Sequence, residues 1–511
     1  MKIKLVLITL LLGLLYPIVL YSGQRANKER PAQDQQRVPQ LPGEGRREGN
    51  SKPSGPELRP AELVNLAGNA RGVPAEFAAD ALIKIAQSDK VKDLNWKKEL
   101  LEEAFRAAVG AQQPVRRVYL QGSVDTREGY LSYAMERRLD ALSLQTRAVR
   151  AMLEIDKTRA RKLFGEIPVK IPLHALNCED DLIYDLSDYY DTLGAVLQNS
   201  FTPLEKQRGD YFSFLETYVN ALEHPAQVGP LAKVIASAEL TVQQQTSIFY
   251  SFSVALKKVV EDDRSFSSSL AGGSMGQGLS ALIASQKQED LKRLLLVALR
   301  EYLARNLNAR RCADNVEGRL NSFLPSSANS ITGSLDVGEI KPAEIGGRTQ
   351  THSYWQSPNT KRLQTQIKEL RFNEEGKRYT EADKESAEWN NKLGDYLNNF
   401  YGWDGSDESP EDFFNQKGVL FSALVDIVPP GPARDNIIQS YVAFLQGSPI
   451  EEENRVEWLL HVNNLIDFAR KDKTSERSKI LDTLQNSGDP VLRVYADLER
   501  LLSASEKATI Q

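Results

Sequence analysis

The chain has 511 residues, of which 41% are hydrophobic and 26% are charged, and its formal net charge is −5. This length suits two or three folded domains, and the composition is ordinary for a folded protein. A chain with this charge has no large positive field to hold a polyanion, which argues against nucleic acid as a partner.

Residues 1–22 have the pattern of an export signal. Lys2 and Lys4 precede the apolar run LVLITLLLGLLYPIVLY at residues 5–21, and a charged start followed by an apolar stretch directs a chain out of the cytoplasm. We therefore expect a periplasmic or secreted protein. Cleavage of the signal is favoured, and the alternative is an uncleaved membrane anchor at residues 5–21, the one membrane contact that we expect.

Composition divides the rest of the chain. Residues 23–58 are rich in Pro, Gly, Gln and charge, which predicts a disordered linker. Helical periodicity then marks an N-terminal region at 59–313 and a C-terminal region at 354–505. Between them, 314–353 lacks periodic apolar residues and is predicted to be a long loop or an inter-domain linker. We expect proteases to cut the two aperiodic segments first.

The N-terminal region begins with two apolar stripes of helical spacing. The first lies in GVPAEFAADALIKIAQS and the second in DLNWKKELLEEAFRAA. Their apolar residues recur every three or four positions, as on one face of an α-helix: Phe77, Ala81, Leu82 and Ile85, then Trp96, Leu100, Leu101, Ala104, Phe105 and Ala108. The pattern predicts two antiparallel helices.

Residues 139–172 carry the clearest repeat-like pattern. Small, turn and aromatic residues recur there at fixed spacing: Ala148, Asp156, Ala160, Phe164 and Pro172. This pattern resembles a tetratricopeptide (TPR) hairpin, with Leu144 where that family prefers Trp and Ala151 where it prefers Tyr. The resemblance covers one hairpin. It implies a pair of packed helices in which small residues permit close approach and Phe164 fills the gap.

Helical periodicity continues from residue 178 to residue 307 and returns after residue 354. In the second stretch, Ser409 and Asp489 each precede a proline and an apolar run, which is typical of a helix N-terminus. Period-two alternation is rare throughout. The sequence therefore predicts an all-α fold of stacked antiparallel helix pairs, an irregular α-solenoid.

A glycine-rich stretch, SSSLAGGSMGQGLSALIAS at residues 267–285, invites comparison with phosphate-binding loops. A dinucleotide fingerprint follows a buried strand, whereas the residues before this stretch are polar. A nucleotide-binding P-loop ends in Gly-Lys-Ser/Thr, whereas Gly278 is followed by Leu279. We therefore expect the glycines to join two helix pairs, with Gly278 or Ser280 near a helix start.

The titratable residues offer no metal or cofactor motif. The four histidines are far apart in sequence, and none belongs to a metal-ligand spacing. Glu457 and His461 share one helix face and are expected to form a surface or partly buried pair. We expect neither a metal nor a cofactor.

Two clusters of charge are candidate sites. Arg147 and Arg150 lie on the first helix of the TPR-like hairpin, where they would bind a carboxylate of a partner if that helix lines a binding face. The alternative is a solvated face. In GWDGSDESPEDFF, Asp404, Asp407 and Glu408 surround a turn and a helix start, which favours a capping role. The alternative is a catalytic role for these carboxylates.

Cys178 and Cys312 are the two cysteines of the chain. In an oxidising compartment they are candidates for a disulfide bridge, and the alternative is a pair of buried thiols.

These observations predict an exported, helical-repeat-like protein with a structural or protein-interaction role, whose partner is another exported or envelope protein. The alternative is an α/α-toroid polysaccharide lyase or glycosidase that uses the acidic cluster.

Overall fold

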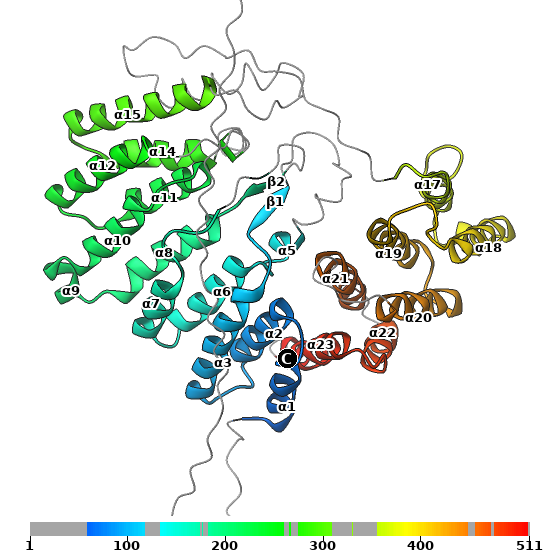
Figure 1. Ribbon diagram of the computed structural model, residues 1–511. Coiled ribbons are helices and arrows are strands. Elements are labelled where there is room, and N and C mark those ends of the chain that lie inside the picture. Colours follow the sequence, from blue (N-terminus) through cyan, green and yellow to red (C-terminus); the bar gives the residue numbers. More distant parts are fainter. Residues whose placement is uncertain are drawn as a thin grey trace, which may run out of the picture. The chain divides into compact units, whose positions relative to one another are not determined.

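The computed structural model describes residues 59–117, 133–173, 176, 182–259, 265–266, 274–308, 330, 355–447, 455–471 and 475–508. The predicted signal, the linker at 23–58 and all but residue 330 of the segment 314–353 lie outside these residues. The described residues belong to one compact unit and are mostly helical, which confirms the predicted all-α class (Figure 1).

Thirteen helices are described in the N-terminal region: α1 (Ala61–Ala70), α2 (Ala75–Gln87), α3 (Leu94–Ala107), α5 (Tyr133–Glu136), α6 (Ala141–Leu153), α7 (Lys157–Glu166), α8 (Ser187–Ser200), α9 (Pro203–Arg208), α10 (Asp210–Asn220), α11 (Pro225–Ser237), α12 (Val242–Leu256), α14 (Ser274–Ser285) and α15 (Glu289–Asn308). A short 3-10 helix, η1 (Ala108–Gly110), extends α3.

Seven helices are described in the C-terminal region: α17 (Pro358–Arg371), α18 (Ala387–Gly402), α19 (Pro410–Ile427), α20 (Pro432–Gln446), α21 (Arg455–Lys471), α22 (Ser475–Gln485) and α23 (Pro490–Ala508). A 3-10 helix, η3 (Asp383–Glu385), precedes α18. The predicted N-caps are confirmed, because the Ser409 hydroxyl accepts a hydrogen bond from the Asp412 N–H and the Asp489 carboxylate accepts one from the Val491 N–H.

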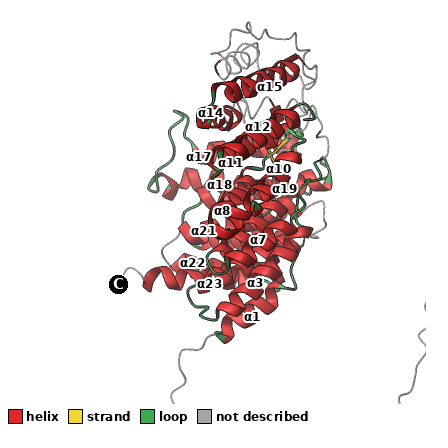
Figure 2. Ribbon diagram, turned by 90° about the vertical axis from the view of Figure 1, so that its left-hand side faces the viewer, coloured by secondary structure: helices red, strands yellow, loops and turns green. Residues whose placement is uncertain are grey.

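The N-terminal helices form two rows. In the first row, α2, α6, α8, α11 and α14 each pack against the next. The second row holds α3, α7, α10, α12 and α15: an ion pair between Glu102 and Arg159 joins α3 to α7, Phe164 and Tyr218 join α7 to α10, and α12 packs between α10 and α15. Figure 2 shows these helices stacked from α1 to α15. The region is a succession of helix pairs, as the sequence predicts.

The TPR-like segment folds as the α6–α7 hairpin. Asp156 caps α7 by accepting a hydrogen bond from the Arg159 N–H, and Ala148, Ala160 and Phe164 are all fully buried. The Phe164 ring stacks on Tyr189 of α8, with 5.1 Å between ring centres. The helix pair that the resemblance implies is therefore present.

One segment differs from the prediction. Helical periodicity was expected from residue 178, but Leu182–Tyr184 form strand β2, which pairs antiparallel with β1 (Val115–Arg117). Helix α8 begins only at Ser187. Because all three residues of β2 are buried, the segment lacks the alternation of burial that usually marks a strand in a sequence.

The glycine-rich stretch contributes to a close crossing of two helices. Gly278 is the fifth residue of α14 rather than a residue near its start, and a Cβ atom there would lie 2.0 Å from the Gly229 carbonyl oxygen on α11. The two backbones are in direct contact, which only glycine at these positions permits. The glycine therefore serves helix packing.

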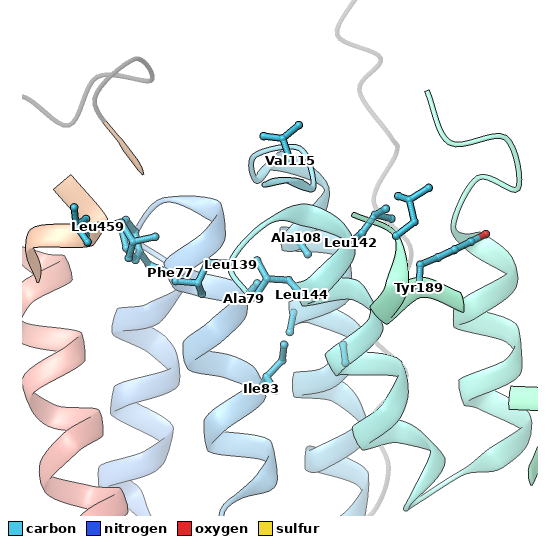
Figure 3. Packing of buried hydrophobic residues seen from close by; sticks show 14 of the residues in the cluster. Phe77, Ala79, Ile83, Ala108, Val115, Leu139, Leu142, Leu144, Tyr189 and Leu459 are labelled. Carbon is cyan, nitrogen blue, oxygen red and sulfur yellow. The ribbon is translucent and has the colours of Figure 1, made fainter. Parts of the chain in front are cut away.

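The C-terminal helices meet the N-terminal ones at α23. Helix α23 packs against α1 and α2, and α21 packs against α5. Phe77 of α2 contacts Trp458 of α21 and Tyr495 of α23, edge to face at 5.6 and 5.7 Å. Figure 3 shows buried side chains from α21, α2, α6 and α8 following one another across this part of the core.

Candidate functional site

A groove of about 710 Å³ opens beside the α6–α7 hairpin. It lies between the end of α3, the start of α6 and the segment that follows α7. Its walls are mainly apolar and include Phe105, Val109, Leu142, Ile167, Ile171 and Leu173. A volume of this size is typical of ligand sites.

The first wall is the segment that leaves η1. The Ala141 N–H donates to the Gln112 carbonyl at 2.8 Å, which fixes this segment to the start of α6. The Tyr184 hydroxyl donates to Gln113 Oε1 at 3.1 Å, and the Asp185 N–H donates to the Pro114 carbonyl at 3.0 Å. Tyr184 of β2 and the residue after it, Asp185, therefore hold this wall. Figure 3 shows Ala108, Val115 and Leu142 at one end of the helices.

The second wall begins where α7 ends. Ile167 is buried, and Pro168 follows it and forces the chain to leave the helix, because proline disfavours the helical conformation of the residue before it. The chain then runs along the groove through Ile171, Pro172 and Leu173.

Gln145 is the buried polar residue of the groove. It lies in α6, lines the groove and is 6% exposed. Among the described residues, none forms a hydrogen bond with its carboxamide, whereas Gln113, the other groove glutamine, is bonded to Tyr184. Its carboxamide oxygen and nitrogen are not fully buried, so the amide faces the open groove. Gln145 therefore presents one acceptor and two donors to whatever occupies the groove.

Arg147, two residues further along α6, lies in a different environment. Its guanidinium donates to Asp80 Oδ1 at 2.7 Å and to the Arg138 carbonyl at 3.1 Å. Lys84 Nζ and the Tyr495 hydroxyl bind the other oxygen of Asp80, at 2.7 and 3.1 Å. Burial alone raises the pKa of Asp80, but the two cations outweigh it and lower the pKa to about 2.

Arg150 also contacts its own chain. Its Nε donates to Thr192 Oγ1 at 2.8 Å, and Nη2 donates to the Asp188 carbonyl at 3.4 Å, so that it joins α6 to α8. Neither Arg147 nor Arg150 lines the groove. A role for them in binding a partner stays a prediction.

The acidic cluster lies at the turn between α18 and α19. Asp407 accepts hydrogen bonds from Trp403 Nε1 at 2.9 Å and Asn359 Nδ2 at 3.0 Å. Burial acts to raise the pKa of Asp407, but these bonds prevail and lower it. The Ser406 N–H lowers the pKa of Asp404, and Glu408 lies 3.4 Å from the Thr360 hydroxyl. A general acid requires a raised pKa, so these interactions fit a turn that joins α17 to α19.

His461 is fully buried, although a surface or partly buried pair with Glu457 was expected. The ring packs against Phe414 and Tyr441, and a Cβ atom on Gly418 would lie 2.3 Å from it. Neither ring nitrogen has a hydrogen-bond partner among the described residues. Burial lowers the pKa of His461 to about 3, so the ring is neutral near pH 7.

Cys178 and Cys312 lie outside the described residues, and their bridge stays a prediction. Across the described part of the chain, no three His, Cys, Asp or Glu side chains are grouped to hold a metal ion. None of the described helices is long and apolar enough to span a bilayer. Comparison of the chain with family models, with curated proteins and with solved structures finds no match.

Proposed function

We propose that this chain is an exported binding protein whose groove beside α6 receives part of another exported or envelope protein, without catalysing a reaction. Export is inferred from the apolar run at residues 5–21 and the lysines before it. The helix stack supplies a rigid support, and a site on such a support needs no catalytic motif.

The observation that carries the proposal is the composition of the groove. Its floor is apolar, its charged residues Arg106 and Glu166 are exposed, and Val109 on its wall is 68% exposed. An apolar centre with a charged rim is the usual arrangement of a protein interface. Exposed apolar side chains next to a concave surface likewise mark sites of interaction.

Site-specific photo-crosslinking tests the proposal in cells that produce the full chain. A photoreactive phenylalanine analogue replaces Val109 in the groove or, as the matched control, Leu204 on α9, which is 61% exposed and does not line the groove. We expect a discrete crosslinked product with an exported protein at position 109 alone. Absence of that product, or equal crosslinking at both positions, would contradict the proposal.

An activity screen tests the same proposal from the other side. The purified chain is incubated with a panel of polysaccharides, and release of unsaturated or reducing sugar ends is measured. We expect none. A polysaccharide-cleaving activity that is lost in the Asp407→Ala variant would contradict the binding function and support the lyase or glycosidase alternative.

A further inference from the structure

We infer that the groove beside α6 binds an extended, uncharged and apolar segment of polypeptide, whose main-chain amide groups pair with the carboxamide of Gln145. The inference rests on the proposed function and specifies the chemistry of the partner. It depends on three features of the groove: an amide without a protein partner, an apolar lining and a rim without excess charge.

The first feature is the amide of Gln145. The side chain is 6% exposed, lines the groove and has no hydrogen-bond partner among the described residues. A carboxamide offers a donor and an acceptor side by side, and a peptide chain in extended form offers the complementary acceptor and donor. A ligand that supplies both gives the amide two hydrogen bonds in place of its contact with water.

The same amide also argues against a helical ligand at this point. In a helix, the N–H and C=O groups beyond the terminal turns are bonded within the helix and are not free for a side chain of another protein. An extended segment leaves its main-chain groups unpaired, and main-chain hydrogen bonds then supply affinity while pockets select side chains. Gln145 therefore matches an extended segment.

The second and third features, the apolar lining and the balanced rim, concern the charge of the ligand. Phe105, Leu142 and Ile171 supply an apolar lining, where an unpaired charge of the ligand would lose its hydration without compensation. At the rim, the Arg106 guanidinium is already bound to Glu102 at 3.2 Å, and Glu166 carries the opposite charge. The rim thus has no excess of either sign, and the segment that fits is neutral and carries aliphatic or aromatic side chains.

A peptide selection tests this inference. The purified full chain is used to select from a phage-displayed library of 12-residue peptides, with counter-selection on the Val109→Asp variant, in which an exposed groove residue gains a charge. We expect neutral, apolar peptides that bind the native chain and bind the variant at least about tenfold more weakly. Enrichment of charged peptides, or of none that distinguish the two chains, would overturn the inference.

Replacement of single peptide bonds by esters then tests the role of Gln145. An ester lacks the N–H donor, so one ester position should weaken binding to the native chain by about tenfold. The same ester should have little effect on the Gln145→Met variant, in which the side chain keeps its length and loses the amide. Equal effects on both chains would show that Gln145 does not form hydrogen bonds with the main chain of the peptide. The ester series on the native chain needs no variant: if no position weakens binding, the inference is wrong.

The two proposals can fail separately. Crosslinking at position 109 together with failure of the peptide selection would keep the protein-binding function and reject the extended segment. If the selected peptides bind but no product forms at position 109 in cells, the groove chemistry is right and the proposed function is wrong. A fluorescent fatty acid provides a third outcome. If it binds the chain, is not displaced by the peptides and binds the Gln145→Met variant equally well, the inferred ligand is an apolar small molecule rather than a peptide.

Discussion

Two largely buried polar residues, Asp80 on α2 and Gln145 on α6, have opposite surroundings. On one side, Asp80 has three partners, Lys84, Arg147 and Tyr495, which come from α2, α6 and α23. On the other side, Gln145 has no partner among the described residues. The first group joins helices, and the second faces an open groove.

The comparison shows where the structure uses polar groups for stability and where it leaves them for a ligand. A buried charge without partners destabilises a fold strongly, so the Asp80 cluster must be complete. An unpaired neutral amide costs less and is tolerated where function needs it. We therefore expect changes at the Asp80 cluster to affect folding and changes at Gln145 to affect binding.

The largest effect on folding is expected for Asp80→Ala. This change leaves Arg147 and Tyr495 without their buried acceptor, and removal of one partner of a buried ion pair costs about 3–5 kcal/mol. Urea denaturation of the full chain measures the free energy of unfolding. The control is Asp191→Ala, which removes an exposed pair with Lys233 and should cost less than about 1 kcal/mol. Equal losses would contradict the distinction drawn here.

Gly278→Ala tests the tightly packed end of the stack, which contrasts with the groove. The new methyl group would overlap the Gly229 carbonyl and force α11 and α14 apart, with an expected loss of about 3 kcal/mol in the free energy of unfolding. Gly394→Ala in α18 is the control, because no heavy atom lies within 4 Å of its Cβ position. It should raise stability by up to about 1 kcal/mol. If Gly278→Ala is as stable as Gly394→Ala, the backbones of α11 and α14 are not in direct contact at Gly278.

Acidification should weaken the C-terminal helices through His461. Its pKa is about 3 in the folded chain and about 6.5 in the unfolded chain, so the unfolded state binds the proton first and stability falls as the pH drops below 6.5. The slope is at most about 1.4 kcal/mol per pH unit. Asp140 acts in the opposite direction between pH 6 and 3.8, because burial raises its pKa to about 6.

The two effects are separated by comparing variants. Between pH 6 and 4.5 the two effects oppose each other in the native chain, so as the pH falls His461→Gln should gain stability relative to the native chain and Asp140→Asn should lose it. Urea midpoints measured across this range decide the matter. Parallel pH profiles for the native chain and His461→Gln would show that His461 does not carry the dependence.

The smallest effect on stability is expected for Gln145→Met. Removal of an unpaired amide that faces the open groove should leave the free energy of unfolding unchanged or raise it by up to about 1 kcal/mol. Arg147→Met, on the same helix, is the matched variant and should lower it, because Asp80 then loses a cation. A loss at Gln145→Met as large as that at Arg147→Met would assign Gln145 to the folding core.

Much of the fold follows from local sequence. Apolar periodicity and capping residues such as Asp156 and Ser409 predict the helix pairs correctly, since both act within one or two turns. The strand at Leu182–Tyr184 was missed because its pairing with Val115–Arg117 depends on residues far apart in sequence. The full burial of His461 was missed for the same reason, since Gly418 makes room for its ring from another helix.

The groove could be predicted only in part. Leu142, Gln145 and Val149 share one face of α6, so a polar residue interrupts an apolar stripe there, and this is a signal in the sequence. Charged residues are the usual candidates for partner binding, and for this reason the sequence points to Arg147 and Arg150 instead. Their partners, Asp80 and Thr192, lie on neighbouring helices, and no local pattern shows such contacts.

Hydrogen–deuterium exchange of the full chain, with and without a peptide selected on the groove, tests the central claim most directly. We predict slower exchange at 111–114 and 167–173, the two segments that form the groove walls outside regular helix, and at the start of α6. Exchange around Asp80 and Tyr495 should stay the same. Protection at α12 and α15 instead, or no change at the groove walls, would contradict the assignment of the groove as the binding site.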